Sequence, residues 1–234
     1  HPDLISKKVA KGTKNFALQP AMTVEEMIQA IEAGMAVFFK AYEKAPVDII
    51  GLGEMGIGNT TAAAAIIAAI TGIPPEDACG RGTGVDDRGL NQKVDIVKKA
   101  LTFHQPDPAD AADAAEVLHK LGGFEIAGIV GAVLAAASKQ TVIVLDGVIS
   151  TAAGLIAWCI NPDIAGYLIA GHQSVEPAQT AALNMMGLTP LIDLGMRLGE
   201  GTGAALAINI VEAACKIMNE MASFEDAQVS GPGE

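Results

Sequence analysis

A single carboxylate, Glu200, lies between two glycines in the stretch "RLGEGTGAA". Glycine permits close backbone approaches, so the chain on either side of Glu200 can pass near a ligand while the side chain points at it. A carboxylate held in this way is suited to accept a proton as a general base. The alternative is a solvated glutamate in a surface turn, and this stretch alone leaves both interpretations open.

A second candidate site follows the glycine turn in "GLGEMGIGNTTAAAAI", where Asn59, Thr60 and Thr61 open a helix. The free N–H groups and the dipole at a helix N-terminus favour anions such as phosphate. Asn and Thr are also ordinary helix caps, so a cap without ligand is the alternative. Lys93, near the start of the helix after "GRGTGVDDRG", would add a point charge beside a phosphate or else remain solvated.

The same turn formally matches the dinucleotide pattern G-x-G-x-x-G at Gly51, Gly53 and Gly56. The acids Glu76 and Asp77, about twenty residues further on, follow a Pro-Pro pair instead of ending a second strand. An asparagine also stands where a P-loop needs its lysine. A dinucleotide site is therefore a weaker interpretation than a generic anion site.

Other chemistry-bearing residues are less informative. "GHQSVEP" offers His172, Ser174 and Glu176, but no G-x-S-x-G elbow frames the serine, so we do not expect a hydrolase triad. The four histidines lack metal-ligand spacing with one another or with cysteine. We predict no metal site and no cofactor.

The elements that must position these residues repeat one arrangement of buried strand, turn and Ala-rich helix. Examples are a strand over 47–52 before the Asn59 helix, "TVIVLDGVISTAAGLIAW" with its turn at Asp146, "AGYLIAGHQSVEPAQTAALNMMG" and "TPLIDLGMRLGEGTGAALAINIVEAACKIM". This order predicts an α/β fold with a mostly parallel sheet and helices on both faces. Ligands of open α/β sheets bind beyond the carboxyl ends of the strands, where these turns lie.

Two further helices are expected outside this repeat. "NQKVDIVKKALTFHQP" has apolar residues at helical spacing and stops at Pro106, and "DPADAADAAEVLHKLGG" ends at Gly122-Gly123. No linker divides the chain, so we expect one nucleotide-binding catalytic domain over 1–234, with a loose tail over 224–234.

Composition limits the class of partner. A formal net charge of -12 argues against nucleic acid, which needs a basic face. Cys79, Cys159 and Cys215 are widely spaced, as reduced thiols of a cytoplasmic protein would be. No apolar stretch is typical of a membrane span or a signal peptide, so we expect no membrane partner.

Taken together, the chain resembles the nicotinate-nucleotide–dimethylbenzimidazole phosphoribosyltransferase family almost from end to end. The matching stretches are "KKVAKGTKNF", "GLGEMGIGNTTAAAAI", "NQKVDIVKKAL", "LGGFEIAGIVGAVLAAAS", "VIVLDGVISTAA", "YLIAGHQSVEPAQ" and, most specific, "MRLGEGTGAALAINIVEAA". The resemblance implies a Rossmann-like fold with small helical additions from the chain ends, a homodimer and no metal. It also implies transfer of phosphoribose from nicotinate mononucleotide to 5,6-dimethylbenzimidazole or a related azole or phenol.

Carried onto this sequence, the family's general base is Glu200. Its substrate contacts are expected at Glu54, Gly56, Asn59, Thr60, Lys93, Asp146, Ser174, Gly199 and Gly201. The two glycines would let the planar substrates lie against the backbone beside Glu200.

One departure from the family concerns the start of the chain. Family members carry a further N-terminal region that helps form the pocket for the aromatic base, and this chain begins after it. We therefore expect the chain alone to bind the acceptor weakly. The alternative functions are a non-catalytic nucleotide-binding or regulatory subunit and a dinucleotide-dependent enzyme.

Overall fold

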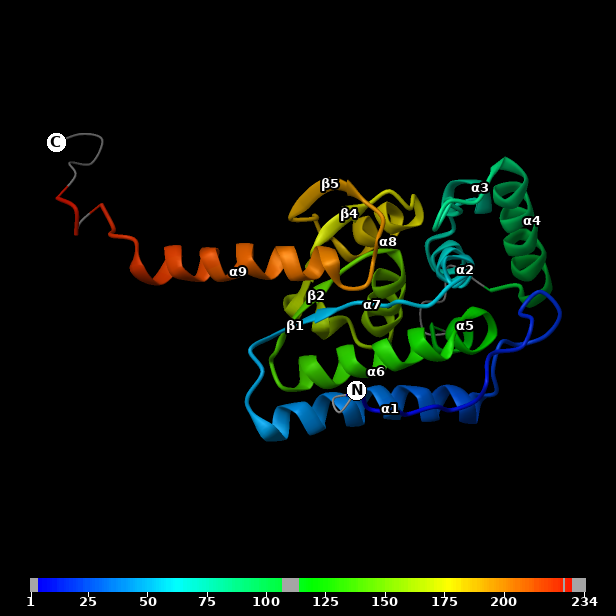
Figure 1. The fold of residues 1–234 in the computed structure, drawn as a ribbon, viewed down its shortest axis with the longest axis horizontal. Helices are drawn as coiled ribbons and strands as arrows, with labels where there is room; N and C mark the ends of the chain where they lie inside the picture. Colours follow the sequence, from blue (N-terminus) through cyan, green and yellow to red (C-terminus); the bar gives the residue numbers. More distant parts are fainter. Residues whose placement is uncertain (1–3, 107–113, 225, 229–234) are drawn as a thin grey trace.

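The computed structural model describes residues 4–106, 114–224 and 226–228. Short strands are distributed among the helices, and the described chain between the first and second strands forms helices but no strand (Figure 1). The helices are α1 (Val24–Lys44), α2 (Thr60–Thr71), α3 (Pro75–Ala78), α4 (Asp87–His104), α5 (Ala114–Leu121), α6 (Phe124–Ser138), α7 (Val148–Ile160), the 3-10 helix η2 (Pro162–Tyr167), α8 (Ala178–Met186) and α9 (Thr202–Glu220). The strands are β1 (Ile49–Leu52), β2 (Val142–Leu145), β3 (Leu168–Ala170), β4 (His172–Ser174) and β5 (Ile192–Met196).

The strands form two parallel sheets. β2 lies between β1 and β3, with Ile49 opposite Val142 and Ile143 opposite Leu168. β4 pairs with β5, with an irregular register after His172. The predicted α/β class with parallel strands is confirmed. The third predicted strand is divided, however, because the chain leaves the first sheet at Gly171, whose N–H still donates to Leu145 O at 2.8 Å.

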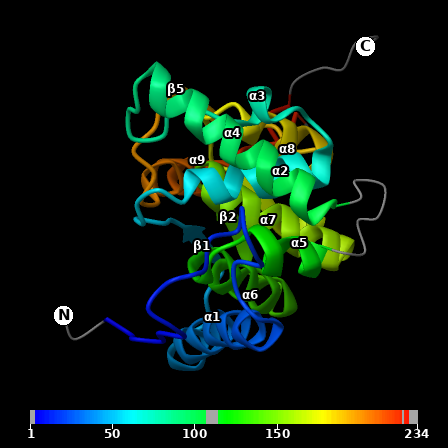
Figure 2. The ribbon, with the colours of Figure 1, turned by 90° about the vertical axis from the view of Figure 1, so that its right-hand side faces the viewer.

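Helices cover both faces of the three-stranded sheet. α9 packs on one face against β1 and β2, while α6 and α7 pack on the other. α1 lies outside α6, and the far end of α9 extends well away from the body (Figure 1). In Figure 2, α2 is seen between α4 and α7, and it also packs against α3, α5 and α8.

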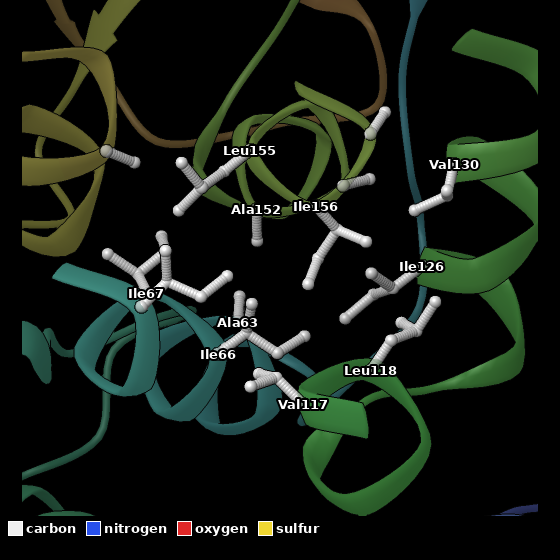
Figure 3. Packing of buried hydrophobic residues seen from close by; sticks show 14 of the residues in the cluster. Ala63, Ile66, Ile67, Val117, Leu118, Ile126, Val130, Ala152, Leu155 and Ile156 are labelled. Carbon is white, nitrogen blue, oxygen red and sulfur yellow. The ribbon is translucent and has the colours of Figure 1, made fainter. Parts of the chain in front are cut away.

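The core is built around α2, whose residues 62–70 are all buried. Its isoleucines meet α7, α5 and α6 in one continuous apolar cluster (Figure 3). The alanines of α2 are small, so neighbouring helices can pack closely against it. The sequence "TTAAAAIIAAIT" also has no polar face that would turn toward water. A helix buried on all sides holds its N-terminus, and therefore the turn before it, in a fixed place.

The two helices outside the repeat agree with the sequence where the structure describes them. α4 ends at His104, two residues before Pro106, and α5 ends at Leu121 before Gly122. The predicted start of α5 over 107–113 and most of the predicted tail lie outside the described residues. In the described part of the chain, no helix has both the length and the apolar character needed to cross a membrane.

Candidate active site

A cavity of about 940 Å³ opens at the carboxyl ends of the strands, where the turns after β1, β2, β4 and β5 meet the loop before α4. Its lining includes the predicted residues Glu54, Gly56, Asn59, Thr60, Lys93, Asp146, Ser174, Gly199 and Glu200. Gly201 is the exception: it lies beneath the lining, where its N–H donates to Asp146 Oδ2 at 3.0 Å. Its backbone thus anchors the turn on Asp146, and its contact with a substrate stays a prediction.

Glu200 sits in a turn of three successive left-handed residues. The φ angles are +74° at Gly199, +59° at Glu200 and +81° at Gly201. Glycine adopts this conformation readily, whereas glutamate does so at an energetic cost that local contacts must offset. The Glu200 N–H donates to Glu54 O at 3.1 Å, and the Glu200 side chain is exposed at the cavity.

The glycines of "GLGEMG" make room for this turn. A Cβ on Gly53 would overlap the backbone of Gly201, and a Cβ on Gly51 would lie 3.1 Å from that of Ala204. Glu76 lies in α3 and pairs with Lys98, so it does not end a strand as a ribose-binding acid should. Gly51 and Gly53 are therefore explained by the close packing of the start of α9 and of the Glu200 turn against this part of the chain.

Glu54, in the turn after β1, lines the cavity. Its Oε1 accepts from the N–H of Gly56 at 2.5 Å. Its Oε2 is buried and has no hydrogen-bond partner among the described residues. A buried acceptor without a partner is costly, so a donor from a ligand would be favourable here.

Asn59 occupies the N-cap position of α2, but its side chain makes no capping bond. The amide instead donates to Glu125 Oε1 at 3.2 Å. Asn59 is therefore the N-cap residue by position, as the alternative interpretation expects, but its side chain does not cap the helix. The residue lines the cavity at the start of α2.

Lys93 is buried at 8% exposure, so the solvated alternative is wrong. Its Nζ donates to Thr60 Oγ1 and to Gly80 O, each at 2.9 Å, and lies 3.7 Å from Glu176 Oε2. Glu176 Oε1 in turn accepts from the Gly82 N–H at 2.7 Å. The Lys93–Glu176 pair thus fastens the glycine-rich loop over 80–84 to the start of α2.

Two arginines complete the positive charge around the cavity. Arg81 pairs with Asp87 and donates to Val85 O at 3.0 Å. Arg197, three residues before Glu200, is exposed and makes no ion pair or side-chain hydrogen bond with the described residues. Sequence reasoning missed Arg197, although its place beside the Glu200 turn was a usable signal.

Asp146 is buried at 1% exposure beneath the Glu200 turn. Besides the Gly201 bond, its Oδ1 accepts from the N–H groups of Gly203 at 2.7 Å and Ala204 at 3.1 Å. Burial alone would raise the pKa of Asp146, but the hydrogen bonds from His172 and these N–H groups outweigh burial and lower it. The carboxylate therefore caps the N-terminus of α9, where the positive end of the helix dipole stabilises its negative charge.

Gln179 of α8 supports the backbone beneath the site, and sequence reasoning missed it as well. It is fully buried, and its Nε2 donates to the backbone oxygens of Asp146 and His172, each at 3.1 Å. Its Oε1 accepts from the N–H of Ser174 at 2.5 Å. The signal was its helical spacing with Ala182, Leu183 and Met186, which places it on the buried face of α8.

Known proteins resemble the chain over its whole length. A profile of the family described as "Phosphoribosyltransferase" matches residues 1–229. The nicotinate-nucleotide–dimethylbenzimidazole phosphoribosyltransferase of Roseiflexus sp. (strain RS-1) is 52% identical over 234 residues, which are 100% of this chain and 65% of that protein. The protein of the same name from Chloroflexus aurantiacus is 50% identical over 230 residues, 98% of this chain and 64% of that one.

A solved structure agrees with these relatives. The crystal structure of CobT from Thermus thermophilus has a TM-score of 0.92 and 43% sequence identity, covering 99% of this chain and 68% of that chain. The chain spans 65% and 64% of the length of the two curated relatives named above.

Proposed function

The chain belongs to the nicotinate-nucleotide–dimethylbenzimidazole phosphoribosyltransferase family, and from this premise we propose that it transfers the phosphoribosyl group of nicotinate mononucleotide to a benzimidazole-type base. With 5,6-dimethylbenzimidazole the products are α-ribazole 5′-phosphate and nicotinate. The observation that carries the proposal is the exposed Glu200 carboxylate, held at the cavity by a left-handed turn anchored on Asp146.

The proposed chemistry needs one base and no change of redox state. The unprotonated ring nitrogen of the azole attacks the anomeric carbon, and the glycosidic bond to nicotinate breaks with its electron pair going to nicotinate. The other ring nitrogen loses its proton to Glu200. General base catalysis of this kind contributes on the order of 10²- to 10⁴-fold. The carboxylate of Glu54 at the cavity would favour positive charge that develops on the ribose.

The nucleotide phosphate is proposed to lie at the start of α2. The first N–H groups of a helix lack partners within the helix and attract anions. Lys93 stands beside Thr60 there, and two of its three N–H donors are used by Thr60 and Gly80. Arg197 is a further cation of the lining for a phosphate or a nicotinate carboxylate.

The direct test is the product mixture formed when the chain meets nicotinate mononucleotide and 5,6-dimethylbenzimidazole. We expect nicotinate and α-ribazole 5′-phosphate in equal amounts, resolved by chromatography and mass spectrometry. Mononucleotide binding without turnover would instead support a non-catalytic nucleotide-binding subunit. Tighter binding of NAD than of the mononucleotide would support a dinucleotide-dependent enzyme.

We further propose that the chain works as a homodimer in the cytoplasm. The family resemblance supports the dimer, and exposed apolar side chains along α9, including Ile210, Ile217 and Met218, are consistent with a covered face. Three free cysteines support a reducing compartment. Sedimentation velocity at micromolar concentration tests the dimer, and a purely monomeric boundary would contradict it.

A further inference from the structure

His172 lies directly beneath the Glu200 turn, and the proposed chemistry does not use it. The residue is 1% exposed at the start of β4. A Cβ on Gly203, in the first turn of α9, would overlap its ring, and a Cβ on Gly147 would lie 3.9 Å from its Nε2. The imidazole is therefore packed between α9 and the turn that follows β2.

Both ring nitrogens of His172 face oxygen atoms that can only accept. Nδ1 is 3.1 Å from the backbone oxygen of Gln173, and Nε2 is 3.5 Å from Asp146 Oδ1. A neutral imidazole carries one N–H, so one of the two oxygens would face a ring lone pair. Only the doubly protonated ring donates in both directions.

The charged groups around the ring favour the same state. Asp146 faces it from the turn after β2, and Asp193 of β5 is a second, more distant acid. α9 contributes Gly203 and α8 contributes the neutral Gln179, whose Nε2 donates to His172 O. The hydrogen bond to Asp146 raises the pKa of His172 above its ordinary value, against the opposing effect of burial.

We propose that His172 is held as a buried imidazolium whose charge balances Asp146, and that it acts through Asp146 as a positioning residue for the Glu200 turn. Three contacts link His172 to this turn: the imidazolium faces the Asp146 carboxylate, the carboxylate accepts from the N–H groups at the start of α9, and α9 continues directly from the turn. Its catalytic consequence rests on the proposed function, whereas the charge state does not.

Loss of the imidazolium charge would leave Asp146 buried without a countercharge. A buried anion in that state is strongly unfavourable, so Asp146 would take up a proton or draw away from its position. Either change weakens its bonds to Gly201, Gly203 and Ala204. Glu200 would then lose its fixed place, and a displacement of about 1 Å in a reacting group can lower a rate by about 10²-fold.

The charge state is tested on the wild-type chain without substrates. Nitrogen-15 NMR of the histidine rings should show both nitrogens of His172 protonated at pH 6.5, with a titration midpoint above 6.5, the ordinary histidine pKa. A ring that is mostly neutral at pH 6.5 would overturn the inference. This measurement is independent of turnover, so it stands or falls apart from the proposed phosphoribosyl transfer.

The positioning role is tested with His172→Gln, which retains an amide donor but carries no charge. We expect kcat to fall roughly tenfold to a hundredfold while KM for nicotinate mononucleotide changes little. In the wild type, kcat should also fall as pH rises through the His172 midpoint, and the variant should lose this dependence. His119→Gln is the matched control, since His119 Nδ1 faces a single carbonyl oxygen of Met22 at 2.8 Å, outside the cavity lining.

A normal kcat in His172→Gln, or an equal loss of kcat in His119→Gln, would overturn the positioning role. If His172→Gln does not fold, the backbone amide shifts of Gly201, Gly203 and Ala204 in the wild type replace it. They should move together with the His172 ring titration, and shifts that ignore this titration would overturn the role.

Discussion

At the scale of single residues, Glu200 combines an unfavourable backbone conformation with an exposed carboxylate. Strain of this kind persists where surrounding contacts hold it, here the bonds from the turn to Glu54 and Asp146. Glu200→Gln keeps the shape but cannot accept a proton. We expect kcat to fall roughly 10²-fold or more with little change in nucleotide affinity. Steady-state kinetics and calorimetric titration check this, and near-normal turnover would remove Glu200 from the role of base.

Lys93 is the residue whose predicted role the structure complicates most, because it is already bonded within the protein. Lys93→Ala should weaken nicotinate mononucleotide by about 1.5–3 kcal/mol, typical of a bond to a charged group. The variant also leaves Glu176 without its partner, so the double variant Lys93→Ala/Glu176→Gln is the control for loop damage. Calorimetric titration should show that both variants lose affinity for the nucleotide and that neither loses affinity for the riboside. Equal losses for both ligands would show that Lys93 does not bind the phosphate.

The Asp146–His172 pair also predicts how stability depends on pH. The pKa of His172 is raised above 6.5, so its contribution is full below that value and lost as pH rises through the folded-state pKa. The pKa of Asp146 is lowered below 3.8, so its contribution is present above 3.8 and lost on acidification through the folded-state pKa. Urea unfolding from pH 6 to 9 should therefore show the stability difference between wild type and His172→Gln shrinking as pH rises. A constant difference would contradict this.

At the scale of elements, glycines set how closely α1 and α6 approach. A Cβ on Gly131 of α6 would overlap the backbone oxygen of Ile31 in α1, whereas a Cβ on Gly128 would lie 3.8 Å from Ala30 O. Gly131→Ala should lower the free energy of unfolding by roughly 1–3 kcal/mol, because the helices must separate. Gly128→Ala, on the same helix, should be neutral or stabilising by up to about 1 kcal/mol, since alanine favours helix. Urea denaturation of the two variants checks the pair, and similar losses in both would contradict it.

Most elements could be predicted from the sequence because their signals are local. The turn at Asp146, the stop before Pro106 and the Ala-rich helix after Asn59 each follow from nearby residues. The split between β3 and β4 could not, because it depends on Gly171 meeting β2, which is distant in sequence. The side-chain partners in the site were equally hidden. Lys93 is bonded to Thr60, and Gly53 makes room for Gly201, through contacts that only the folded chain creates.

At the scale of the whole molecule, the three free thiols differ in how far they are buried. Burial raises the pKa of Cys159 to about 11 and also raises that of buried Cys79, while Cys215 lies exposed on α9. Thiolate is the reactive form, so the first two should react with iodoacetamide only on unfolding. Mass spectrometry of the native protein, labelled at pH 8 and diluted until it sediments as a monomer, should find label on Cys215 alone. Labelling that persists in native Cys215→Ser would contradict the prediction.

The order of strands in the first sheet also bears on how the chain folds as it is made. β1 finds its partner only when β2 is present, since Ile49 pairs with Val142. At a synthesis rate of about 5–20 residues per second, the intervening segment takes roughly 5–20 seconds to follow. During that interval the edge of β1 has no strand to pair with, and sequence-distant pairings of this kind also close slowly. The nascent chain is therefore most exposed to aggregation before β2 emerges, and a chaperone that shields β1 during that interval would raise the folded yield.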